Sequence, residues 1–67
     1  MITITYGEDT GFVDKDFNEL EAITEIAQLG DRNLFIDGTL IEDTESVTID
    51  DLKDASYIMV QNAIIGA

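Results

Sequence analysis

The stretch SYIMVQNA at residues 56–63 decides how this chain is expected to fold. Its apolar side chains fall on both faces of an extended chain, which is typical of a strand in the middle of a sheet. We expect Ile58 and Val60 to face the core and Tyr57 and Met59 to point outward as partner contacts. A one-residue change of register would bury Tyr57 and Met59 instead. The stretch therefore predicts a central final strand.

Two hairpins surround this strand in our interpretation. ITITY at residues 2–6 alternates, which predicts a strand that buries Ile2, Ile4 and Tyr6. The turn residues at 7–11 and the pair FV at 12–13 complete the first hairpin. NLFI at 33–36 and TLI at 39–41 flank Asp-Gly, the strongest short hairpin signal.

One helix is expected over residues 17–29. Asp16 is the expected cap, with Glu19 three residues later as in an acidic capping box. Gly30 is the expected left-handed stop. The predicted apolar face is formed by Leu20, Ile23 and Ala27, with Ile26 on its flank. Residues 49–52 are expected to form one further short helical turn.

The element order is therefore β-β-α-β-β, a short turn, then β. This order predicts an α+β domain with one helix across one face of a mixed sheet. With the last strand placed beside the first, the arrangement is the β-grasp, or ubiquitin-like, fold. We expect one domain over residues 1–67, with a tail at 64–67.

The composition argues against an enzyme. The chain has no histidine and no cysteine, so it lacks the commonest general base, the thiolate nucleophile and the usual transition-metal ligands. It has no Gly-rich phosphate loop and no nucleophile elbow. We expect no catalytic residues, no cofactor and no metal.

The net charge of −12 limits the kinds of partner. Such a charge repels nucleic acid and anionic membranes and favours association with basic protein surfaces. No apolar run is long enough to cross a bilayer, and the N-terminus has no basic region typical of a signal peptide. We therefore expect a cytoplasmic protein, monomeric when free, with a protein partner and no direct nucleic-acid or membrane contact.

Two acidic patterns in the sequence have features of metal sites. Asp14, Asp16, Asn18 and Glu25 occupy calcium-loop positions, but Glu19 stands where the loop needs glycine. The acid clusters at 42–45 and 50–54 are typical of a solvated loop, although they could also hold Mg²⁺ weakly or mimic phosphates. Neither pattern leads us to predict a metal.

Three segments resemble a known family. NLFIDGTLI at 33–41, LKDASYIMV at 52–60 and the tail QNAIIGA at 61–67 are similar to the bacterial sulfur carriers of thiamine biosynthesis. The length also suits the small subunit of molybdopterin synthase. The resemblance implies a carrier tail at Gly66 and Ala67, which a partner enzyme adenylates and which sulfur transfer converts to a thiocarboxylate. It also implies partner contacts through Ile64 and Ile65.

The tail departs from the family at its last position. The family ends in two glycines, whereas here Gly66 is followed by Ala67. A methyl group at that position fits poorly into a channel that admits only glycine. Either the chain is a divergent carrier, or it keeps the fold without the chemistry.

Two other hypotheses remain open. The first is a non-catalytic acidic binding protein or inhibitor, of phage or plasmid type, that docks on a basic partner surface. Ubiquitin-like folds bind partners through apolar residues on the exposed sheet face, for which Tyr57, Met59, Phe35 and Ile41 are the candidates. The second is a small structural subunit that pairs through an edge strand.

Overall fold

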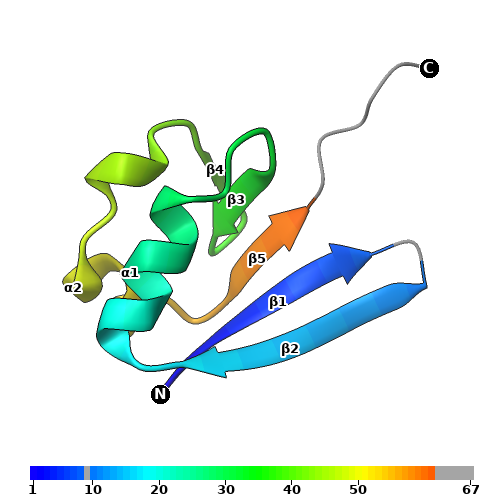
Figure 1. Cartoon of the computed structure of the whole chain (residues 1–67), viewed down its shortest axis with the longest axis horizontal. Coiled ribbons are helices and arrows are strands. Elements are labelled where there is room, and N and C mark those ends of the chain that lie inside the picture. The colour runs from blue at the N-terminus through cyan, green and yellow to red at the C-terminus, as the bar shows by residue number, and fades with distance from the viewer. Residues whose placement is uncertain (9, 62–67) are drawn as a thin grey trace.

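The structure is a computed structural model that describes residues 1–8 and 10–61. Five strands form one mixed sheet, in the order β2-β1-β5-β3-β4. The elements are β1 (Ile2–Glu8), β2 (Gly11–Phe17), α1 (Glu19–Ala27), β3 (Asn33–Ile36), β4 (Thr39–Ile41), the 3₁₀ turn η1 (Thr44–Ser46), α2 (Ile49–Asp54) and β5 (Ile58–Gln61). Figure 1 shows α1 lying over the sheet. The fold is a small α+β arrangement that is compatible with a β-grasp.

The final strand lies where the sequence predicts it. β5 is central, pairs with β1 in parallel, and pairs with β3 in antiparallel orientation. Its apolar residues Ile58 and Val60 are both buried, which confirms their assignment to the core face. The strand begins two residues later than expected, because the Asp37 carboxylate accepts hydrogen bonds from the backbone N–H groups of residues 56 and 57. Residues 62–63 of the expected strand lie outside the described residues.

The second strand is much longer than predicted. The sequence predicts only residues 12–13, but β2 extends to Phe17 and pairs with β1 along its whole length. Aspartate is a poor strand former, which explains the short prediction. In the fold, Thr3 and Thr5 donate hydroxyl hydrogen bonds to Asp16 and Asp14 on β2, at 2.6 and 2.7 Å. These cross-strand pairs hold the acidic segment in the sheet.

The predicted start of the helix is wrong. Asn18, not Asp16, is the N-cap, and its partner in the capping box is Glu21 rather than Glu19. Asp16 is still part of β2, so it cannot cap the helix. Gly30 has a φ of 64°, the left-handed conformation predicted after the helix.

The predicted apolar face of α1 is also partly wrong. The buried residues on this side are Ala22, Ile26 and Leu29, which follow each other at intervals of four and three. Leu20 is 73% exposed, and Ala27 is exposed as well. The helix is therefore rotated so that Ile26, expected on the flank, lies at the centre of the packed face.

The second hairpin and the short helix α2 are both present where the sequence predicts them. Asp37 and Gly38 have φ values of 51° and 83°, as the turn between β3 and β4 requires. The helical turn predicted at 49–52 extends to Asp54 and has its own capping box from Thr48. Leu52 on α2 is buried.

The core lies between the helices and one face of the sheet. Strand residues on that face alternate with residues that point to the other side. The buried apolar residues are Ile2, Ile4, Tyr6, Ala22, Ile26, Leu29, Leu34, Leu52, Ile58 and Val60. Burial of Ile2, Ile4 and Tyr6 confirms the face predicted for the first strand.

Candidate protein-docking face

The side of the sheet opposite the helices carries a group of apolar side chains. We call this side the open face, because no described helix covers it. The side chains on this face are known from strand alternation, because residues adjacent in sequence to a core residue of a strand point to the opposite side of the sheet. The group, which we call the apolar band, consists of Phe12, Phe35, Leu40, Tyr57 and Met59.

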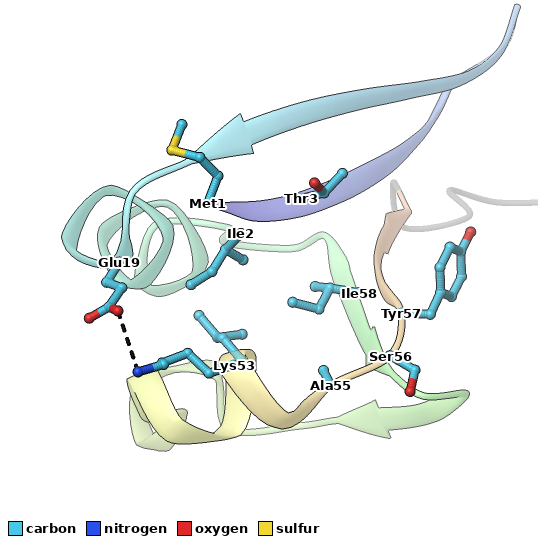
Figure 2. Close-up of a pocket in the computed structure, with 10 residues that line it drawn as sticks. Met1, Ile2, Thr3, Glu19, Lys53, Ala55, Ser56, Tyr57 and Ile58 are labelled. Atoms are coloured by element: carbon cyan, nitrogen blue, oxygen red, sulfur yellow. Dashed lines mark ion pairs between the residues drawn. The ribbon is translucent and has the colours of Figure 1, made fainter.

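The members of the band differ in how far they reach into solvent. Phe12 is 69% exposed, Leu40 47% and Tyr57 48%, whereas Phe35 and Met59 are half-buried between their neighbours. Figure 2 shows Tyr57 and Ile58 pointing in opposite directions from the chain, Ile58 toward the core. The band thus lies outside the core and is supported from below by the sheet.

Strand register aligns part of the band into a row across all five strands. Asp14 pairs with Thr5, Thr5 with Met59, Met59 with Phe35, and Phe35 with Leu40. We call these five residues the cross-strand row. It is acidic at the β2 edge and apolar from β5 to the β4 edge.

Gly7 lets two members of the band approach each other over β1. A β-carbon at Gly7 would lie 3.3 Å from Cγ of Gln61, 3.5 Å from Cε of Met59 and 3.6 Å from Cε1 of Phe12. The ring of Phe12 and the methyl group of Met59 therefore both lie next to the space that a side chain at Gly7 would fill. Because the glycine has no side chain, this space above β1 stays open to both of them.

The charges on the two sides of the sheet differ. The three lysine and arginine side chains are on the helix side. Lys15 lies over the Tyr6 ring, with Nζ 5.2 Å from its centroid, Arg32 is 4.0 Å from Glu25, and Lys53 is 3.6 Å from Glu19. Strand pairing with Thr5 and Thr3 places the carboxylates of Asp14 and Asp16 on the open face.

Tyr6 is the described residue with a clearly perturbed pKa, and it lies on the core side. Its hydroxyl donates a 3.0 Å hydrogen bond to Glu25 on α1. Burial, together with the hydrogen bond and the charge of Glu25, raises the pKa of the Tyr6 phenol to about 12. A phenol held protonated in this way ties β1 to α1, and its position beneath the helix suits a structural role.

A groove of about 400 Å³ opens between the start of β1 and the segment that joins α2 to β5. Figure 2 shows the groove, with Ile2 and Ile58 facing each other inside and the Lys53–Glu19 ion pair at one end. Both members of that pair are about half exposed. The groove residues are Met1, Ile2, Thr3, Glu19, Leu52, Lys53, Ala55, Ser56, Tyr57 and Ile58. This set holds no nucleophile–base pair, so the groove has no evident chemistry.

The structure places two of the six predicted site residues. Tyr57 and Met59 are on the open face, as the predicted register requires. Ile64, Ile65, Gly66 and Ala67 lie outside the described residues.

Sequence reasoning misplaced one apolar candidate and missed two. Ile41 packs against the core, and its neighbour Leu40 is the residue on the open face. The pairing of Ile41 with buried Leu34 decides this, and the three-residue strand alone did not reveal it. Phe12 was also missed, because its importance depends on Gly7 and Met59, which are its neighbours only in the folded sheet.

The carboxylates of the calcium-like pattern lie on different elements. Asp14 and Asp16 belong to β2, and Glu25 belongs to α1. Within residues 1–8 and 10–61, no three carboxylates gather in a way that could hold a metal ion. In the same part of the chain, no helix has both the length and the apolar character needed to span a bilayer.

Comparisons with known proteins identified no relative of this chain. A scan against protein-family models found no matching family, and searches of curated proteins and of solved structures found no match. A functional assignment therefore depends on the residues described above.

Proposed function

We propose that this chain is a non-catalytic β-grasp module that binds a protein partner through the open face of its sheet. The observation that carries this proposal is the apolar band, which lies opposite the helices and includes three large side chains that are 47–69% exposed. Isolated exposed apolar residues are common, but a contiguous group is typical of an interaction site.

The sheet topology supports the β-grasp part of the proposal. The order β2-β1-β5-β3-β4, with the last strand central and parallel to the first, is the arrangement expected for that fold. The chemistry of the side chains supports a binding role, since the chain has neither histidine nor cysteine. Aromatic and methionine side chains are enriched at the centres of protein interfaces.

Two matched variants test the role of the open face. Phe12→Ser and Leu20→Ser each replace a large apolar side chain, 69% and 73% exposed respectively, by the same polar one. Phe12 is on the open face, whereas Leu20 is on α1. Both proteins should fold, because exposed substitutions change stability by only about 0.5 kcal/mol.

The measurement is quantitative capture of partners from a lysate of the source cells, read by mass spectrometry. We expect a protein that is captured by the unchanged chain and by Leu20→Ser but depleted with Phe12→Ser. Its binding should then be reproduced with the purified partner. Equal capture by both variants would contradict docking through the open face.

A sulfur carrier is the second candidate function. It is favoured by the central position of β5, which leads the chain from the middle of the sheet toward the tail. In that function a partner adenylates the terminal carboxylate and releases pyrophosphate, and a sulfur nucleophile then displaces AMP. The feature that opposes it is the departure from the family's glycine pair, since Gly66 is followed here by Ala67.

Removal of Gly66 and Ala67 separates the two functions. A docking module captures its partner with or without these residues, whereas a carrier captures an adenylating enzyme only with its tail intact. For a carrier, incubation with that enzyme, ATP and a sulfur donor should give the mass increase expected when sulfur replaces one carboxylate oxygen. An unchanged mass with a verified active enzyme would exclude this function.

A further inference from the structure

We infer that the partner segment bound by the open face is a basic amphipathic helix, laid across the strands along the cross-strand row. This inference rests on the proposed docking function and adds the chemistry and geometry of the partner. It follows from the spacing of the row, from its polarity and from the separation of charge between the two sides of the sheet.

The spacing of the row matches a helix. Neighbouring strands lie about 4.8 Å apart, so the apolar side chains of Leu40, Phe35 and Met59 repeat at nearly the 5.4 Å pitch of an α-helix. A helix that crosses the sheet can therefore place one apolar side chain over each of these strands. The helix positions i, i+3 or i+4, and i+7 meet this requirement.

The acidic end of the cross-strand row determines where the partner helix must carry its positive charge. From Leu40 on β4 to Asp14 on β2 there are four strand intervals, or about 19 Å. At 1.5 Å per residue this is about 13 helical residues. A lysine or arginine between i+11 and i+14 therefore reaches the carboxylate of Asp14.

The two carboxylates at the β2 edge are positioned in advance. Asp14 and Asp16 are held by the hydroxyl groups of Thr5 and Thr3, so little side-chain entropy is lost when a cation binds. Asp14 lies at the end of the row. Asp16, two residues further along β2, adds to the negative field on the same face.

The cations of the chain do not neutralise this field. Lys15, Arg32 and Lys53 are engaged on the helix side with Tyr6, Glu25 and Glu19. With a net charge of −12, a second copy of the same chain would be repelled from the open face. Charge complementarity therefore favours a basic partner over self-association.

A designed peptide provides the test. The probe is a 17-residue helix with leucine at i, i+3 and i+7, lysine at i+11 and i+14, and alanine or glutamine elsewhere. The control peptide has glutamate in place of both lysines. Affinities are measured by calorimetry with the full chain, and contacts are mapped by amide shifts of the ¹⁵N-labelled protein.

Two matched variants distinguish a local ion pair between Asp14 and the peptide from attraction by the overall negative charge of the protein. Asp14→Asn removes the charge at the end of the row but keeps an oxygen that can accept the Thr5 hydrogen bond. Asp54→Asn removes one charge from exposed α2, on the other side of the molecule. Both variants change the net charge by the same amount.

The expected result is binding of the lysine peptide, with shifts concentrated on Thr5, Phe35, Leu40 and Met59. Asp14→Asn should weaken the affinity about three- to fivefold, as for one solvent-accessible ion pair, and Asp54→Asn should change it less than about 1.5-fold. The difference should shrink as salt rises, because screening weakens the pair. The glutamate peptide should not bind.

Equal effects of the two variants, or shifts centred on α1 and α2, would overturn the inference. The proposed docking function can fail separately, because its test is the loss of natural-partner capture by Phe12→Ser. If that capture is lost but the lysine peptide is insensitive to Asp14→Asn, the open face docks a partner of different chemistry.

Discussion

Tyr6 links the sheet to the helix, and its substitution by phenylalanine tests how strongly. The hydroxyl donates a 3.0 Å hydrogen bond to Glu25, and the ring is only 6% exposed. Tyr6→Phe keeps the ring, and with it the contact to Lys15 above it. The substitution therefore removes the hydroxyl and little else.

At neutral pH the expected loss of stability is small. A hydrogen bond to a charged group contributes about 1.5–3 kcal/mol, but Glu25 stays accessible to water and remains near Arg32 in the variant. We therefore expect the free energy of unfolding to fall by about 1 kcal/mol.

In alkaline solution the stability advantage of the unchanged protein over Tyr6→Phe should shrink and then reverse. The pKa of the phenol is about 12 in the folded protein and 10.0 in an unperturbed tyrosine. Folding therefore favours the protonated phenol, and this contribution is complete below pH 10 and is lost as the pH rises toward 12. Compared with Tyr6→Phe, the free energy of unfolding of the unchanged protein should fall by about 1 kcal/mol between neutral pH and pH 11, and by about 2 kcal/mol between neutral pH and pH 12.

The assay is urea unfolding followed by far-ultraviolet circular dichroism at pH 7, 9, 10, 11 and 11.5, because the chain has no tryptophan to report on unfolding. Alkaline effects that do not involve the phenol cancel in the difference between the two proteins. In a Tyr57→Phe background Tyr6 is the single tyrosine, and its ultraviolet titration should have a midpoint near 12. Stability curves that stay parallel from pH 9 to 11.5, or a phenol that titrates near 10, would refute this reasoning.

Further substitutions test the packing, the turn and the helix cap by the same unfolding assay. Ile26→Ala, at a fully buried site, should cost about 2–5 kcal/mol and leave so small a domain largely unfolded, whereas Leu20→Ala on the exposed side of α1 should cost less than about 0.5 kcal/mol. Asp37→Ala should cost about 2 kcal/mol or more, because two backbone N–H groups at 2.8 Å lose their acceptor and alanine is strained at the φ of 51°. An unchanged stability would contradict both effects. Asn18→Ala should cost about 1 kcal/mol, because α1 loses its N-cap side chain, and an unchanged stability would contradict the assignment of Asn18 as the cap.

The helix α1 shows which features can be predicted from local sequence patterns and which cannot. A helix before Gly30 was predicted from its apolar period and its acidic start, and α1 is there. Its cap was misassigned because Asp16 and Asn18 are both good capping residues by sequence. The pairing of Asp16 with Thr3, thirteen residues away, decides between them, and no local pattern contains that information.

The open face shows the same limit. Alternation placed Tyr57 and Met59 on one side of the final strand, and the burial of Ile58 and Val60 agrees. Alternation did not place Ile41, because a strand of three residues is too short to show which face is apolar.

By itself, the sequence determined the features that depend on near neighbours along the chain: the alternating first strand, the helix, the Asp-Gly turn and the apolar strand at the centre of the sheet. Only the tertiary structure decided the features that depend on partners distant in sequence. The length of β2 depends on threonine hydroxyl groups in β1, and the apolar band depends on strand pairing that brings Phe12 and Met59 to either side of Gly7. The physical reason is that hydrogen bonding and apolar contact act between groups that are close in space, and strand pairing determines which residues those are.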